Sequence, residues 1–127
     1  MILFKPGLDF KIMFHVADEN GRFIITKIIY EELAFVLVNI YAPNRVPEKK
    51  EFFKHIMHVL KDMNISITDC IVSGGDWNSI FDEKLDKSGG IVQGSNIVAE
   101  MTNIINDYDL HDIWRIQHND MKRFTFR

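Results

Sequence analysis

Residues 73–79, Ser-Gly-Gly-Asp-Trp-Asn-Ser, combine a turn-prone backbone with two side chains that can act on a phosphate. They follow the apolar run 70–72, so a strand ending in two glycines would deliver Asp76 and Asn78 to the rim of a sheet. Asp76 can accept a proton from an attacking water, and Asn78 can hold a phosphoryl oxygen without charge repulsion. The same residue types also suit an ordinary turn, so their chemistry alone leaves both interpretations open.

Four apolar segments are predicted to be the strands that position this loop. Alternating and β-branched residues in these segments favour strands, and polar turn residues between the first three predict an antiparallel meander. The fourth segment leads directly into the Gly-Gly-Asp loop. The expected strands are residues 10–16, 23–30, 33–41 and 69–72.

Two amphipathic helices are predicted to cover the sheet. Pro47 fits the first turn of one helix, and apolar residues between 52 and 63 then recur at helical spacing. A second helix is expected over residues 96–108, with Ser95 as its N-cap. Residues 79–95 are polar and contain glycines, which predicts a long surface loop. The expected fold class is therefore α/β (α+β), with residues 1–127 forming a single domain.

Charge and length limit the possible functions. A chain of 127 residues that is 46% hydrophobic can build one core. A net charge of -3 and a pI near 5.9 argue against tight nonspecific binding of nucleic acid, which normally needs a basic face. Basic residues do gather around the first predicted helix, and a solvated helix face is the ordinary explanation of such a group. These residues are Arg45, Lys49, Lys50, Lys54 and Lys61.

The single cysteine and the absence of long apolar segments bear on the cellular compartment. Cys70 is the only cysteine, so an internal disulfide is impossible, and its apolar surroundings predict a small buried thiol. No segment approaches the roughly 20 apolar residues that span a bilayer. The sequence is therefore expected to be intracellular, without a membrane function.

Two further segments extend the pattern around Asp76. Residues 36–44 read Val-Leu-Val-Asn-Ile-Tyr-Ala-Pro-Asn, and residues 110–115 read Leu-His-Asp-Ile-Trp-Arg, followed by Arg-Phe-Thr-Phe at 123–126. In this order and spacing, the chain resembles the endonuclease/exonuclease/phosphatase family, and most of all the apurinic-type endonuclease domain of LINE-type (non-LTR) retrotransposons. The resemblance runs from about Gly21 to Phe126. It implies part of a two-sheet α/β sandwich with mainly antiparallel strands.

The resemblance also implies roles for five residues. Asp76 matches the family's general base or water-positioning residue, and Asn78 matches its phosphate-contacting partner. Tyr41 and Asn44 match residues that reach the scissile phosphate, and Thr125 matches a position close to bound nucleic acid. Without the resemblance, Tyr41 would be interpreted as a strand-end aromatic and Asn44 as a turn residue.

The family is Mg²⁺-dependent, and DNA is the partner that its retrotransposon members imply. Its metal-binding Glu and its terminal Asp-His pair have no matching positions in the chain, so the chain is expected to be an internal fragment of that domain. Such a fragment should hold Mg²⁺ weakly or not at all and should be inactive alone. Its uncovered apolar faces and strand edges should favour association. The alternative is a noncatalytic α/β remnant that binds nucleic acid or a partner. A nuclear location is expected if the chain belongs to a retrotransposon protein.

Overall fold

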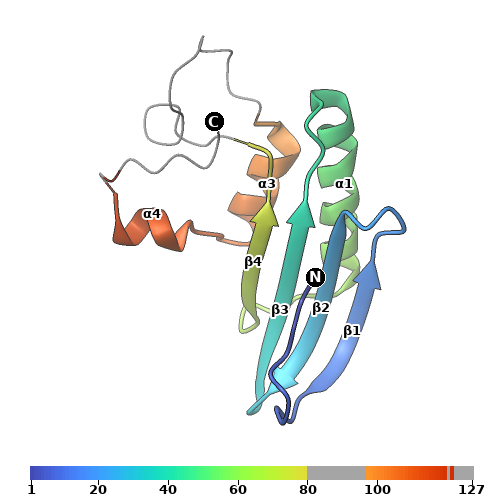
Figure 1. Cartoon of the computed structure of the whole chain (residues 1–127), viewed down its shortest axis with the longest axis vertical. Helices are drawn as coiled ribbons and strands as arrows, with labels where there is room; N and C mark the ends of the chain where they lie inside the picture. The colour runs from blue at the N-terminus through green and yellow to red at the C-terminus, as the bar shows by residue number, and fades with distance from the viewer. Residues whose placement is uncertain (80–96, 120, 122–127) are drawn as a thin grey trace.

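The computed structural model describes residues 1–79, 97–119 and 121, which contain one mixed four-stranded sheet and three helices (Figure 1). The strand order is β1-β2-β3-β4, so β1 and β4 are the edges of the described sheet. This arrangement confirms the predicted α/β (α+β) class with mainly antiparallel strands and two amphipathic helices. The strands are β1 (Lys11–Ala17), β2 (Phe23–Tyr30), β3 (Leu33–Tyr41) and β4 (Cys70–Asp76), and the helices are α1 (Val46–Asp62), α3 (Ala99–Asp107) and α4 (Ile113–Gln117).

The first three strands form the predicted antiparallel meander. Glu31 and Glu32 connect β2 to β3 with φ angles of 49° and 66°, and positive φ at both central residues is the geometry of a type I′ hairpin turn. The chain then crosses over through α1, so that β4 pairs parallel to β3. This crossover brings the carboxyl ends of β3 and β4 together at one end of the sheet.

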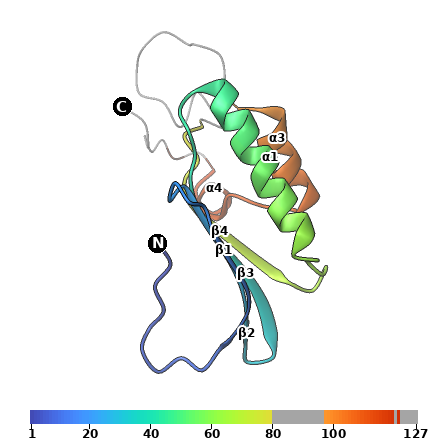
Figure 2. The same ribbon diagram turned by 90° about the vertical axis from the view of Figure 1, so that its right-hand side faces the viewer.

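α1 and α3 pack beside each other on one face of the sheet (Figure 2). The apolar stripe of α1 contributes Phe53, Ile56 and Leu60 to the core, and α3 contributes Met101 and Ile104. Burying each such side chain stabilises the fold by about 1.5–3 kcal/mol, which holds both helices on this face. No helix in the described part of the chain has the length and apolar character needed to cross a membrane. The sheet residues of the core are Phe23, Ile25, Val36, Val38 and Ile40.

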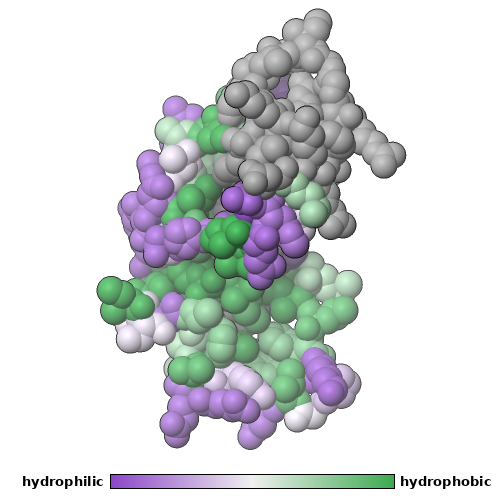
Figure 3. All heavy atoms as spheres, turned by 90° about the vertical axis from the view of Figure 1, so that its left-hand side faces the viewer, coloured by the Kyte–Doolittle hydropathy of each residue, from purple (hydrophilic) through white to green (hydrophobic). Residues whose placement is uncertain are grey.

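Exposed apolar side chains lie away from the helix-covered face. Val72 on the edge strand β4 is 51% exposed, and Ile113 and Ile116 on α4 are more than 60% exposed. Figure 3, which views the molecule from the β4 side, shows apolar atoms gathered over much of this surface. An edge strand of the described sheet that lies beside apolar surface favours association, which stays a prediction for this chain.

The structure corrects three details of the sequence-based interpretation. β4 continues through both glycines to Asp76, whereas the predicted strand ended at residue 72, because parallel pairing with β3 extends that far. Cys70 is exposed rather than buried, since it begins an edge strand. The second helix begins at Ala99, where the chain reaches the core through the buried Val98 at the N-cap position. The predicted N-cap, Ser95, lies outside the described residues.

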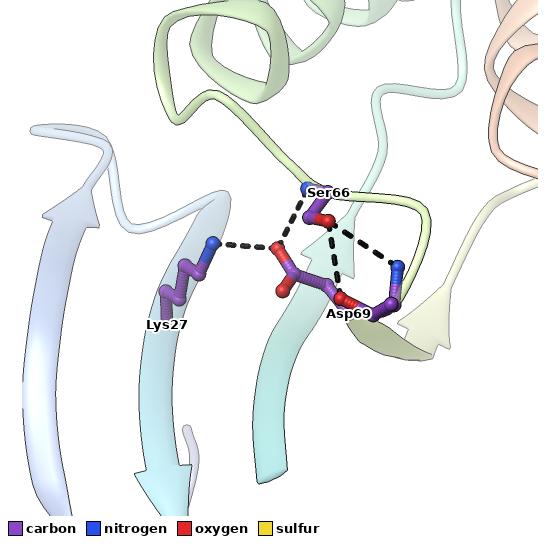
Figure 4. Close-up of polar contacts among 4 residues, drawn as sticks. Lys27, Ser66 and Asp69 are labelled. Atoms are coloured by element: carbon purple, nitrogen blue, oxygen red, sulfur yellow. Dashed lines mark hydrogen bonds and ion pairs between the residues drawn. The ribbon is translucent and has the colours of Figure 1, made fainter.

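A partly buried ion pair ties the connection between α1 and β4 to the sheet (Figure 4). The Nζ atom of Lys27 on β2 lies 2.5 Å from Oδ2 of Asp69, and the backbone N–H of Ser66 donates to the same oxygen at 2.9 Å. Burial raises the pKa of Asp69, but these two hydrogen bonds and the positive charge of Lys27 outweigh it, so the pKa lies below its ordinary value. The pair therefore fixes the chain where it enters β4.

Candidate functional site

The carboxyl ends of β3 and β4 bring Tyr41, Asp76 and Asn78 into one neighbourhood. Tyr41 is the register partner of Asp76, and the N–H of Ala42 donates to the carbonyl oxygen of Asp76 at 2.8 Å. Because register partners in neighbouring strands share a face of the sheet, the side chains of Tyr41 and Asp76 leave the sheet side by side. Both residues are exposed, and Asn78 is partly buried.

The backbone conformation of Gly75 allows the end of β4 to lie close to β3. Its φ angle is +110°, a conformation that residues with a Cβ rarely adopt. A Cβ added there would lie 2.0 Å from the carbonyl oxygen of Ile40 on β3. At Gly74, in contrast, an added Cβ would meet no atom within 4 Å. The second glycine is therefore the one that the close contact between the strands requires.

Hydrogen bonds orient the side chains of Asp76 and Asn78. The backbone N–H of Asn78 donates to Oδ1 of Asp76 at 2.9 Å, which closes a turn over residues 76–78. The Nδ2 atom of Asn78 donates to the carbonyl oxygen of Ala42 at 2.6 Å. Asn78 has a φ of 49°, in the left-handed region that asparagine tolerates better than most residues. The turn after β4 is therefore tied directly to the chain that leaves β3.

Lys49 on α1 lies at the candidate site, where the sequence-based interpretation did not place it. It was grouped with solvated basic residues, but it is completely buried. Its Nζ atom donates to the carbonyl oxygen of Asn78 at 2.5 Å and to Oγ of Ser79 at 3.1 Å. Burial lowers the pKa of Lys49, and the negative charge of Asp76 partly opposes this shift. Helical spacing was the available signal, because Lys49 precedes Phe53 by four residues and lies in line with the apolar stripe of α1.

The ring of Trp77 anchors the same turn to the core. It stacks on Phe53 of α1, with ring centroids 5.5 Å apart and an interplanar angle of 27°. Trp77 is partly buried, as expected for a ring that packs beneath the loop. The turn is thus held by aromatic packing as well as by hydrogen bonds.

The other two predicted site residues are less closely defined by the structure. Asn44 is exposed and lies in the connection between β3 and α1, immediately before the N-cap residue Arg45. Thr125 lies outside the described residues. The structure therefore brings together Tyr41, Asp76 and Asn78, and it adds Lys49 to them.

A Mg²⁺ ion at the ends of β3 and β4 would need several oxygen ligands. Mg²⁺ prefers octahedral coordination by oxygen atoms, commonly with one or two carboxylates. Within residues 1–79, 97–119 and 121, no group of three or more His, Cys, Asp or Glu side chains could hold a metal ion. Asp76 places one carboxylate at the ends of β3 and β4.

Comparison with known proteins relates the chain to a transposon protein. No family model matches the chain. The chain is similar to the "Transposon TX1 uncharacterized 149 kDa protein" of Xenopus laevis, with 25% identity over 124 residues. The match covers 98% of the chain but 9% of that protein, so the chain spans only a small part of the length of this relative.

Proposed function

We propose that the chain is the central part of a Mg²⁺-dependent, DNA-nicking phosphodiesterase domain in a retrotransposon protein. The observation that carries this proposal is the pairing of Tyr41 with Asp76, next to a turn that is tied to β3 through Asn78. The motif order around these residues and the similarity to a transposon protein support the same proposal.

The chemistry is hydrolysis of a phosphodiester bond. A water oxygen attacks phosphorus and its proton passes to the carboxylate of Asp76, while the bond from phosphorus to the leaving oxygen breaks. The leaving oxygen keeps the electron pair and takes up a proton from solvent. Asn78 and Tyr41 are neutral groups that contact the phosphoryl oxygens, where negative charge grows in the transition state. The hydrogen bond from Asn78 to Ala42 keeps the amide in place for this contact.

Further groups must complete the site. The sequence has no match to the family's metal-binding Glu or to its Asp-His pair, and no group of three or more His, Cys, Asp or Glu side chains that could hold a metal ion lies among the described residues. We propose that these groups come from sequence that flanks residues 1–127 in a longer polypeptide. Mg²⁺, when bound, supplies positive charge near the phosphoryl oxygens.

A supercoiled-plasmid nicking assay tests this function. We expect a polypeptide extended on both sides of residues 1–127 to convert supercoiled DNA to open circles in the presence of Mg²⁺, and EDTA to abolish the reaction. The 127-residue chain alone should show no nicking. Failure of the extended polypeptide to nick DNA, while it still binds DNA or a protein partner, would instead favour the noncatalytic alternative.

A further inference from the structure

Lys49 occupies a position that is unfavourable for a cation. The side chain is 0% exposed, and removing an ammonium group from water is costly unless it is paired and hydrogen-bonded. Its backbone N–H makes a first-turn hydrogen bond to the carbonyl oxygen of Arg45, so Lys49 lies near the positive end of the α1 dipole. The fold must therefore provide compensating interactions for this charge.

Compensating interactions come from the turn that carries the candidate catalytic groups. The ammonium group donates to Asn78 and to Ser79, and Oγ of Ser79 donates in turn to the carbonyl oxygen of Trp77 at 3.1 Å. Attraction from the negative charge of Asp76 acts in the same direction. One lysine on α1 thus interacts with each of the residues from Asp76 to Ser79, directly or through one hydroxyl group.

We propose that Lys49 is a positioning residue of the phosphodiesterase site, which fixes the turn 76–79 so that Asp76 and Asn78 meet the phosphate in one geometry. This inference rests on the proposed function. Lys49 does not touch the reacting atoms. It acts by holding the carbonyl group of Asn78 while the N–H of the same residue holds Asp76. Losing this restraint should slow the chemical step more than it weakens DNA binding, because a misplacement of about 1 Å can cost about 100-fold in rate.

The variants Lys49→Met and Lys50→Met provide a matched comparison. Methionine preserves most of the apolar length of lysine and removes the charge and the donors. Lys50 is the next residue on α1, but its side chain is 52% exposed and pairs with Glu100 across 3.7 Å. Both variants change the net charge equally, so differences between them report on the buried contacts of Lys49.

Nuclear magnetic resonance on the 127-residue chain tests the restraint itself. We expect Lys49→Met to shift the side-chain NH₂ resonances of Asn78 and to speed exchange of its backbone N–H by about tenfold, the equivalent of one lost hydrogen bond. Lys50→Met should leave the Asn78 side-chain resonances and the exchange rate of its backbone N–H unchanged. If Lys49→Met does not fold, Ser79→Ala replaces it, and a smaller change in the same resonances is expected. Unchanged Asn78 resonances in the folded variant overturn the proposal.

Nicking kinetics of the extended polypeptide test the role in the reaction. We expect Lys49→Met to lower kcat about 100-fold and to leave KM for DNA within about twofold. A rise in KM with an unchanged kcat overturns the positioning role and indicates DNA binding instead. If the unmodified extended polypeptide does not nick DNA, the proposed function fails and this role fails with it, even if the Asn78 resonances shift as expected.

Discussion

Gly75→Ala is expected to separate the end of β4 from β3 and to destabilise the fold strongly. The φ of +110° costs about 1–3 kcal/mol for a residue with a Cβ. In addition, the new Cβ would lie 2.0 Å from the carbonyl oxygen of Ile40, so the strands must move apart. Losing about two ladder hydrogen bonds adds roughly 1–3 kcal/mol. The sum is about 4 kcal/mol, a large fraction of the roughly 5–15 kcal/mol that stabilises a typical domain.

Urea denaturation followed by tryptophan fluorescence measures this loss, and Gly74→Ala is its matched control. With a slope of about 2 kcal/mol/M, Gly75→Ala should lower the midpoint by about 2 M urea. Gly74→Ala places its Cβ in open space without a positive φ, so its free energy of unfolding should change by no more than about 1 kcal/mol. Equal midpoints for the two variants would show that the close contact at Gly75 does not exist.

Three further perturbations probe the packing and the electrostatics. Asp69→Asn should make the free energy of unfolding less sensitive to acid. The folded-state pKa of Asp69 lies below its ordinary value, so the stabilisation from its pairing with Lys27 is present above about pH 4. This stabilisation is lost as the pH falls through the lower folded-state pKa. Urea midpoints measured from pH 7 to pH 2 should show a shallower loss for the variant, and an identical acid profile would contradict the ion pair. Phe53→Ala should destabilise the fold by about 3–5 kcal/mol in urea denaturation, because it opens a cavity under Trp77; a loss below about 1 kcal/mol would contradict its burial. Asn78→Ala should cost about 1 kcal/mol in the same measurement, because its bond to Ala42 is lost, and no loss would contradict that bond.

The local elements were predictable because each has a strong sequence signal. Alternation and turn residues located β2 and β3, and the apolar stripe after Pro47 located α1. The extension of β4 through Gly74 and Gly75 was not predictable, because glycine normally favours a turn and only pairing with β3 holds it extended. Tertiary pairing overrides local propensity at that point.

The candidate site was only partly predictable for a similar reason. Asp76 and Asn78 are close in sequence, so their proximity follows from the motif, whereas the pairing of Asp76 with Tyr41 requires the parallel register of β3 and β4. The burial of Lys49 depends on how α1 sits against the turn after β4, which composition does not reveal. The exposure of Cys70 likewise depends on β4 lying at the edge of the described sheet.

The most direct test of the proposed site is a comparison of two single-turnover nicking rates in the extended polypeptide. One is the rate of Asp76→Asn, and the other is the rate of Asp62→Asn. Both changes replace an exposed carboxylate by an amide, but Asp62 lies at the end of α1, where it pairs with His58. We expect Asp76→Asn to slow nicking by about 10²–10⁴-fold and Asp62→Asn to nick at the unmodified rate. Equal rates for the two variants would contradict a catalytic role for the carboxylate at the ends of β3 and β4.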